Sequence, residues 1–334
     1  MRILVRVPTW VGDCLLAQPA LESLRRSRPG ADIWLLGPAW VRDLFPPKKL
    51  AAGVIPLGET GSLRGLRRAA RTLRAARFDA GLLLTNSFGS ALLFALAGIP
   101  ERWGYRRDGR GFLLTRGVRA ETNGAPRHQL EYYLDLVRGL GMTPAPARVR
   151  LRLSARETRA AGAALEALGV DLSRPVVVLS PGASYGPAKR WPAERFAALG
   201  ALFQKKNRAE IVITGSAGER ELAGRVAALL PRRAAVLAGL TDLRRLLAVL
   251  SRASLVVSND SGAMHLANAL RVPVTAVFGP TDPAATRPYH QPSVVLKKDV
   301  ACWPCLYREC PYDHRCLTSI TPEEVYAAAR MFLP

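Results

Sequence analysis

The run Val176-Val-Val-Leu-Ser-Pro-Gly-Ala-Ser-Tyr-Gly-Pro-Ala-Lys-Arg-Trp-Pro192 contains the pattern that decides the fold of this chain. Its first four residues are aliphatic, which is typical of a strand buried on both faces. Glycine and proline then mark a loop, and Pro192 stands where a helix tolerates proline, at its beginning. A strand, a loop and a helix in this order form the repeating unit of a parallel α/β sheet.

Short apolar strands alternate with helices along both halves of the 334-residue chain. The first half opens with a predicted strand at 2–7, and the second repeats the pattern over 176–278. Four predicted strands of the second half precede loops rich in Gly, Ser, Asn or Pro, and such loops meet at one edge of a parallel sheet. We therefore predict two doubly wound, Rossmann-like α/β domains facing each other across a cleft, at 1–165 and 172–320, with a final helix at 321–334.

The chain is strongly basic, with 48 Lys and Arg against 26 Asp and Glu and a formal net charge of +22. A hydrophobic content of 49% excludes a disordered chain. The charge predicts an anionic partner, but there is no basic tail and no recognisable nucleic-acid-binding module, so we expect no nucleic acid. Six arginines within Arg64–Arg77 fall near one helical face. That face is either solvated or meets anionic lipid or a phosphorylated acceptor.

Two stretches of the first hundred residues could direct the chain to a membrane, and neither is predicted to do so. The N-terminus, Met1–Pro8, lacks the apolar core of a signal peptide, which predicts a cytoplasmic protein. The stretch Ala80–Pro100 is uncharged and long enough to span a bilayer. However, the polar run Thr85–Ser90 interrupts it, so we expect a buried strand, a loop and a helix instead.

Three loops carry residues suited to chemistry. Gly12 and Asp13 stand between the first strand and the first helix, where Asp13 is either a capping residue or a catalytic base. Lys189 ends the loop after the strand at 176–179, and an ammonium beside a flexible backbone suits a diphosphate. The sequence lacks both the Walker loop and a G-x-G-x-x-G run after the first strand, which argues against a dinucleotide dehydrogenase.

The third loop, Ser258-Asn-Asp-Ser-Gly-Ala-Met-His265, follows another predicted strand. Ser261 and Gly262 begin a helix there, so free backbone N–H groups are expected to point into the cleft. Asp260 is able to accept hydrogen bonds from sugar hydroxyls. His265 lies one turn further on, and structural and functional roles are equally compatible with its position.

Six segments of the sequence match one family in the right order. They are Trp10-Val-Gly-Asp13, Asn86-Ser-Phe-Gly-Ser-Ala91, Ala97-Gly-Ile-Pro100, Pro181–Pro192, Asn259-Asp-Ser-Gly-Ala-Met-His265 and Gly279-Pro-Thr281. Together they resemble glycosyltransferase family 9, and within it the type II lipopolysaccharide heptosyltransferases. The most specific segments are Gly-Pro-Ala-Lys-Arg-Trp-Pro and Asn-Asp-Ser-Gly-x-Met-His.

The resemblance implies a GT-B fold and an inverting glycosyltransferase that needs no metal or other cofactor for catalysis. It implies ADP-L-glycero-β-D-manno-heptose as the donor, bound by the second domain. The implied acceptor, bound by the first domain, is the heptosyl-Kdo-lipid A inner core of lipopolysaccharide. Such an acceptor implies an enzyme peripherally associated with the inner face of the cytoplasmic membrane.

By the same resemblance, Asp13 is the general base that deprotonates the acceptor hydroxyl, and Lys189 pairs with the diphosphate leaving group. The donor-side residues are Ser184 for the phosphates, Asp260 for heptose hydroxyls, Ser261 and Gly262 for backbone contacts, His265 near the diphosphate, Glu219 for the ribose and Thr241 near the adenine. The acceptor-side residues are Gly12, Asn86 and Ser87. Residue chemistry agrees with this assignment, because an inverting transfer needs a base and a stabilised leaving group, and no Asp-x-Asp metal motif occurs.

Four of the five cysteines fall within one short segment, as Cys302-x2-Cys305-x4-Cys310-x5-Cys316, with His314 among them. This spacing permits convergence on one structural zinc ion. Unligated thiols, disulfides and an iron–sulfur cluster remain alternatives, although a cytoplasmic location disfavours disulfides.

Other functions compete with the type II assignment. A type I or type III heptosyltransferase, or another family 9 enzyme, would differ in its acceptor. A basic nucleic-acid-binding protein is suggested by charge alone, and a catalytically idle sugar-nucleotide sensor is disfavoured because Asp13 and Lys189 are both present.

Overall fold

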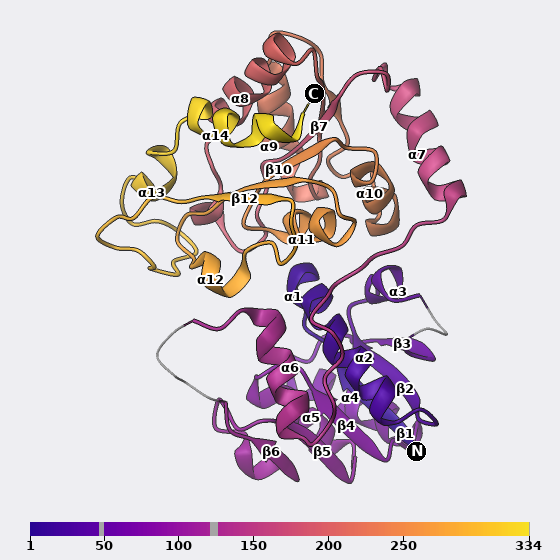
Figure 1. The fold of residues 1–334 in the computed structure, drawn as a ribbon. Helices are drawn as coiled ribbons and strands as arrows, with labels where there is room; N and C mark the ends of the chain where they lie inside the picture. The colour runs from indigo at the N-terminus through magenta and orange to yellow at the C-terminus, as the bar shows by residue number, and fades with distance from the viewer. Residues whose placement is uncertain (47–49, 121–125, 334) are drawn as a thin grey trace. The chain divides into compact units, whose positions relative to one another are not determined.

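The computed structural model describes residues 1–46, 50–120 and 126–333, which form two compact units (Figure 1). The first unit is Met1–Val149 and the second is Arg150–Pro334. The division therefore falls earlier than the boundary at 165 that the sequence suggested, and the C-terminal helix belongs to the second unit. Each unit is built on its own six-stranded parallel sheet with flanking helices, which confirms the predicted α/β class.

The first unit contains a sheet with strand order β3-β2-β1-β4-β5-β6, in which every pairing is parallel. Its strands are β1 (Arg2–Arg6), β2 (Asp32–Gly37), β3 (Gly53–Pro56), β4 (Ala80–Leu83), β5 (Glu101–Tyr105) and β6 (Arg116–Val118). Its α-helices are α1 (Val11–Leu16), α2 (Gln18–Ser27), α3 (Val41–Leu44), α4 (Leu63–Ala75), α5 (Phe88–Leu96) and α6 (Gln129–Gly139), with the 3-10 turn η1 (Gly111–Leu113). The central strands β1 and β4 are almost wholly buried because helices cover both faces, and the middle of β1 is aliphatic, Ile3-Leu-Val5.

The second unit repeats this topology with strand order β12-β11-β10-β7-β8-β9, again all parallel. Its strands are β7 (Val176–Ser180), β8 (Glu210–Ile213), β9 (Ala235–Val236), β10 (Leu255–Asn259), β11 (Val274–Val277) and β12 (Ser293–Leu296). Its α-helices are α7 (Ala155–Ala167), α8 (Ala193–Lys206), α9 (Arg220–Ala228), α10 (Leu243–Leu250), α11 (Gly262–Ala269), α12 (Pro283–Thr286), α13 (Arg315–Thr318) and α14 (Pro322–Ala329). The 3-10 turns are η2 (Pro187–Lys189), η3 (Ala217–Glu219) and η4 (Arg330–Phe332).

Both sheets have the same strand order, with a point where the direction of winding reverses. In the first unit this switch point lies between β1 and β4, and in the second it lies between β7 and β10. Ligands of open parallel sheets bind beyond the carboxyl ends of the strands at such a switch point. The fold therefore marks one candidate ligand edge in each unit.

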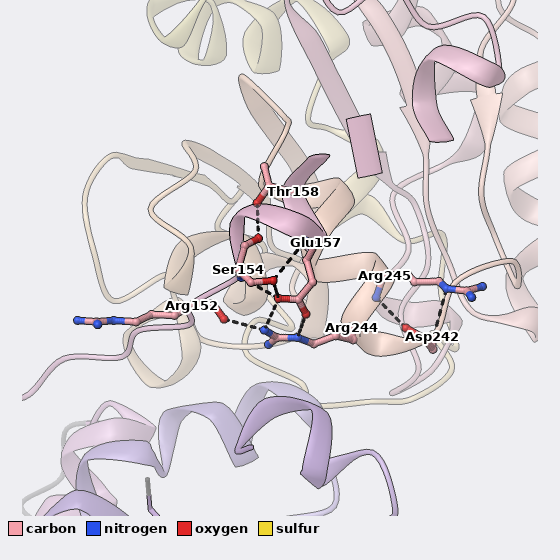
Figure 2. Close-up of polar contacts among 7 residues, drawn as sticks. All are labelled: Arg152, Ser154, Glu157, Thr158, Asp242, Arg244 and Arg245. Atoms are coloured by element: carbon pink, nitrogen blue, oxygen red, sulfur yellow. Dashed lines mark hydrogen bonds and ion pairs between the residues drawn. The ribbon is translucent and has the colours of Figure 1, made fainter. Parts of the chain in front are cut away.

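Helix α7 belongs to the second unit, where hydrogen bonds join its first turn to α10 (Figure 2). Ser154 and Glu157 form a capping box at the start of α7. The Glu157 carboxylate also accepts two hydrogen bonds from Arg244 of α10, at 2.5 and 3.0 Å. Arg244 in turn donates to the carbonyl oxygen of Arg152 at 2.8 Å. These hydrogen bonds, chiefly to the guanidinium of Arg244, hold the pKa of Glu157 down at about 2.

The uncharged stretch 80–100 forms β4, a loop and α5, as the polar residues in its middle predicted. Among the described residues, no helix combines the length and the apolar character that spanning a bilayer requires.

Candidate active site

The acceptor-side residues predicted from the sequence all lie at the switch point of the first unit. Gly12 and Asp13 follow β1, within α1, and Asn86 and Ser87 follow β4. Because β1 and β4 are neighbouring parallel strands, their carboxyl ends bring these four residues to the same edge of the sheet.

Asp13 is half-buried in the first turn of α1, between the buried residues Gly12 and Cys14. The buried Tyr133 of α6 lies close enough that the Asp13 charge acts on it. Burial raises the pKa of Tyr133 well above its usual value, and the Asp13 carboxylate adds to that shift. Burial likewise raises the pKa of the Cys14 thiol, so both neighbours stay uncharged at neutral pH.

Asn86 is held from two sides within the first unit. Its side-chain amide donates to the hydroxyl of Tyr132 at 2.9 Å, and its carbonyl oxygen accepts from Arg110 at 3.4 Å. Arg110 is fully buried and also bonds the carbonyl oxygens of Tyr105, at 3.0 Å, and of Thr85. The loop after β4 is therefore fixed by a buried guanidinium, and burial lowers the pKa of Arg110.

Two exposed aromatic residues flank the acceptor-side residues, and the sequence did not single them out. Trp10 precedes Gly12 and is 44% exposed, and Phe88 follows Ser87 and is 41% exposed. The Phe88 ring lies 6.1 Å from that of the exposed Phe112, centroid to centroid. Exposed aromatic side chains grouped at one edge are typical of a ligand-contacting surface.

The donor-side residues predicted from the sequence lie at the carboxyl edge of the second sheet. Ser184 and Lys189 follow β7, Glu219 follows β8, Thr241 follows β9, and Asp260, Ser261, Gly262 and His265 follow β10. The parallel order of these four strands brings the eight residues to one edge.

Lys189 and Asp260 form a buried ion pair at the switch point between β7 and β10. The Lys189 ammonium donates to the Asp260 carboxylate, and their side chains are 11% and 5% exposed. The hydroxyls of Thr281 and Thr286 donate to the same carboxylate at 2.7 and 3.3 Å. Asp260 is therefore held by three groups, and the ammonium is held at the edge of the sheet where the fold predicts a ligand.

Asn259 fixes the loop that carries Lys189, a role the sequence did not reveal. Its fully buried side chain accepts from the backbone N–H of Trp191 at 3.0 Å and donates to the carbonyl oxygen of Pro181 at 2.7 Å. Asn259 thus joins the end of β10 to both ends of the loop after β7. Its place within the motif Asn-Asp-Ser-Gly was the only signal, and no spacing rule gives its partners.

Helix α11 begins beside the ion pair. Ser261 is its N-cap residue, and its hydroxyl bonds that of Ser258 at 2.9 Å. Because the first N–H groups of a helix have no partner within it, the start of α11 offers backbone donors to an anion or a hydroxyl. His265 is buried on the first turns of this helix.

The remaining donor-side residues have simpler surroundings. Glu219 binds the backbone N–H and the hydroxyl of Ser216, at 2.7 and 2.9 Å, as a capping box. Its carboxylate also lies against Gly182, where a Cβ atom would be only 2.1 Å from Glu219 Oε1. Ser184 is exposed, and Thr241 stands just before Asp242, the N-cap of α10. Glu219 therefore has a capping function in addition to any contact with a ligand.

The four clustered cysteines line one pocket of the second unit. Cys302, Cys305 and Cys310 are half-buried, Cys316 is buried, and none forms a disulfide. His314 starts α13 and does not line that pocket. Within the described residues, no three His, Cys, Asp or Glu side chains are already arranged as metal ligands.

Two doubly wound units, each with polar residues at its switch point, have the architecture of GT-B glycosyltransferases. Comparison with known proteins gives the family. The sequence profile of glycosyltransferase family 9 (heptosyltransferase) matches residues 66–315. The chain belongs to this family, as the sequence motifs indicated.

Individual relatives agree with the family assignment. The chain is 33% identical to lipopolysaccharide heptosyltransferase 2 of Escherichia coli over 311 residues, which cover 89% of this chain and 88% of that protein. It is 32% identical to lipopolysaccharide heptosyltransferase 2 of Salmonella typhimurium over 314 residues, with the same coverage of both chains. The solved structure of E. coli ADP-heptose lps heptosyltransferase II superimposes on this chain with a TM-score of 0.84 at 29% sequence identity. The superposition covers 99% of this chain and 98% of that chain. The predicted GT-B fold is thereby confirmed.

Proposed function

We propose that this enzyme transfers heptose from ADP-L-glycero-β-D-manno-heptose to the heptosyl-Kdo-lipid A inner core of lipopolysaccharide, with inversion and without a catalytic metal. The observation that carries the proposal is the buried pair of Lys189 and Asp260 beside the start of α11. A lysine and free backbone N–H groups at a switch point suit a sugar nucleotide diphosphate. The relatives named lipopolysaccharide heptosyltransferase 2 support the choice of donor and acceptor.

Lys189 stabilises the departing diphosphate in this proposal. Charge develops on the leaving group as the glycosidic bond breaks, and a fixed ammonium offsets that charge in a water-poor site. Asp260 keeps the hydroxyls of Thr281 and Thr286 as donors when Lys189 turns to the phosphates. The carboxylate then remains hydrogen-bonded and is able to accept from hydroxyls of the heptose.

Asp13 is the general base on the acceptor side. It removes the proton of the attacking hydroxyl while that oxygen bonds to the anomeric carbon from the face opposite the diphosphate. Asn86 and the aromatic residues Trp10 and Phe88 lie at the same edge and orient the acceptor. The displacement inverts the anomeric centre because one nucleophile replaces one leaving group in a single step.

The test measures ADP release from ADP-heptose by the purified enzyme with three Kdo-lipid A acceptors that carry no heptose, one heptose or two heptoses. We expect turnover only with the acceptor that carries one heptose, without added Mg²⁺ or Mn²⁺, and a product one heptose heavier by mass spectrometry. Turnover with the heptose-free acceptor would establish the type I activity instead, and turnover with the acceptor carrying two heptoses would establish type III. A salt-sensitive shift of DNA without any turnover would favour the nucleic-acid-binding alternative.

Helix α4 supports a peripheral position at an anionic membrane. It buries Leu66, Ala70 and Leu73 and exposes five arginines on its remaining surface. These are Arg64, Arg67, Arg68, Arg71 and Arg74. Among the ion pairs of the described residues, none involves these five. Arg74 donates to the carbonyl oxygen of Leu96, and the other four side chains are exposed. Each Arg near an anionic lipid surface contributes about 1 kcal/mol to binding.

Sedimentation with vesicles checks the membrane proposal. We expect the enzyme to pellet with phosphatidylglycerol vesicles and not with phosphatidylcholine vesicles. The double substitution Arg68→Glu and Arg71→Glu should weaken binding by about tenfold or more. Arg156→Glu with Arg159→Glu, two exposed arginines at the same spacing on α7, is the matched control. Equal losses in both double variants would assign the effect to net charge and not to α4.

A further inference from the structure

The cysteine-rich segment 302–316 lies against two loops of the donor edge. From it, the backbone N–H of Leu306 donates to the carbonyl oxygen of Pro280 at 3.0 Å, and the indole of Trp303 donates to the carbonyl oxygen of Thr281 at 3.2 Å. Thr281 is one of the residues that hold the Asp260 carboxylate. The segment is therefore in direct contact with the loop after β11 that completes the ion-pair site.

The same segment also contacts the loop that carries Lys189. The hydroxyl of Tyr185 donates to the carbonyl oxygen of Leu306 at 2.6 Å. The backbone N–H of Ala188 donates to the carbonyl oxygen of Arg308 at 3.0 Å. A Cβ atom on Gly186 would be only 2.3 Å from the Arg308 carbonyl oxygen. The two backbones thus approach as closely as a glycine permits, three residues before Lys189.

The segment has little regular structure to hold this position. No helix or strand lies between Leu296, the end of β12, and Arg315, the start of α13, and all of these residues are described. Leu306, Tyr307 and Tyr312 are each at least half exposed. Structureless stretches of this length are uncommon inside compact domains, and ordering one costs conformational entropy at every residue. A cross-link within the segment would offset that cost.

The four cysteine side chains supply the groups for such a cross-link. They line one pocket together with Ala188 and Pro280, which belong to the two donor loops. The cavity between these side chains has a volume of about 10 Å³. This is roughly enough room for one water molecule. Each cysteine reorients by rotation about a single bond between staggered positions. Four thiolates in an ion-sized pocket suit a tetrahedral Zn²⁺ or Fe²⁺ ion.

Two oppositely charged side chains line the pocket beside the cysteines. Arg315 lies close enough to Cys302 and Cys310 to be affected by their charge, and it pairs with Asp313 at 2.9 Å. The ion itself would therefore offset most of the charge of the four thiolates. A metal ion that binds the Cys316 sulfur displaces the thiol proton to solvent.

We propose that Cys302, Cys305, Cys310 and Cys316 bind one thiolate-preferring metal ion, Zn²⁺ or Fe²⁺, which fixes the segment that positions the Lys189 loop. The ion is structural and takes no part in the transfer. The metal site is independent of the proposed function, whereas its effect on the donor loop rests on that function.

The first experiment measures metal in the full-length protein, purified under reducing conditions without a metal-affinity tag. We expect about one zinc or iron per chain by elemental analysis, which identifies the metal directly. The double variant Cys302→Ser with Cys305→Ser should lose the metal, while Cys14→Ser, the fifth cysteine, should retain it. Less than a tenth of an ion per chain after growth with both metals supplied would overturn the site, as would a thiol count that shows disulfides among the four.

The second experiment tests the link to the donor loop by calorimetric titration with ADP, which needs neither acceptor nor turnover. We expect the metal-free double variant to bind ADP roughly tenfold more weakly, because a misplaced ammonium loses its contact with the phosphates. Circular dichroism checks that the variant is folded. Unchanged ADP affinity in a folded, metal-free variant would overturn the positioning role. If the wild type binds metal but not ADP, the proposed function fails and the metal site stands.

Discussion

The switch points of the two sheets have the same topology and different chemistry. Between β7 and β10, opposite charges from the two strands are buried together as Lys189 and Asp260. Between β1 and β4, one strand contributes the carboxylate of Asp13 and the other an amide, Asn86, backed by the buried Arg110. The same backbone plan thus carries an ammonium–carboxylate pair in one unit and a carboxylate with a nearby amide in the other, because the loops of each sheet carry different residues.

The substitution Asp13→Asn should cause the largest loss of turnover and leave the second unit unaffected. Loss of a general base costs about 10²- to 10⁴-fold in turnover, and we expect single-turnover rates to fall within this range. ADP affinity, measured by calorimetry, should stay unchanged because the donor residues lie in the second unit. Turnover near that of the wild type would remove Asp13 from the role of base.

The substitution Lys189→Ala should affect both turnover and ADP affinity. Removing one group that stabilises developing charge costs about 10²- to 10³-fold in rate. The fold should persist, because the hydroxyls of Thr281 and Thr286 still satisfy the Asp260 carboxylate. Lys205→Ala, an exposed lysine on α8, is the control. An active Lys189→Ala variant with normal ADP binding would contradict the leaving-group role.

Asn259→Ala and Asn86→Ala compare how rigidly the two loops are held. The first variant leaves the buried N–H of Trp191 and the carbonyl of Pro181 without partners, and each such group costs about 1 to 3 kcal/mol. We expect the free energy of unfolding in urea to fall by roughly 2 to 4 kcal/mol. Asn86→Ala should cost about 1 kcal/mol or less, because Asn86 is only half-buried. Equal losses would show that both loops depend equally on their asparagines.

The smallest effect concerns the attachment of α7 to the second unit and depends on pH. The pKa of Glu157 is about 2 in the folded protein, against a usual value of 4.5. A carboxyl with a lowered pKa stabilises the fold above its usual pKa and loses that contribution as pH falls from about 4.5 towards 2. Because the pair is partly exposed to solvent, we expect about 1 kcal/mol or less.

Unfolding by urea at pH 7 and at pH 3 checks this last prediction. The difference in unfolding free energy between wild type and Glu157→Gln should be present at pH 7 and shrink at pH 3. Asp242→Asn, which caps α10 without contacting α7, is a matched control. A difference that grows on acidification would contradict the sign of the pKa shift.

The sequence predicted most of the central strands, but not the interior strand β5 or the outer strands β3, β6 and β12. The runs at β1, β4, β7, β10 and β11 are buried on both faces, so they stand out as aliphatic stretches. The outer strands β3 and β12 are only partly buried, and β6 has three residues. Their pairing depends on the neighbouring strand and not on their own pattern, so the sequence analysis omitted them.

Helix α7 shows why the domain division lies at Val149 and not at residue 165, as the sequence suggested. The sequence of Ser154–Glu157 contains a capping-box signal, but the helix joins the second unit through Arg244, 87 residues further on. No local pattern reports a partner at that separation. The boundary therefore had to come from tertiary contacts.

The sequence by itself determined the α/β class, the repeated strand-loop-helix unit, the family and the placement of Asp13, Lys189 and Asp260 at strand ends. These features follow from local periodicity and from motifs that lie within a few residues of one another. Only the tertiary structure decided that Lys189 and Asp260, 71 residues apart, form one buried pair. It likewise decided that Asn259 locks the Lys189 loop and that the cysteine-rich segment rests on it. Such partners are fixed by the order of strands in the sheet, which brings distant loops to one edge and which no local stretch encodes.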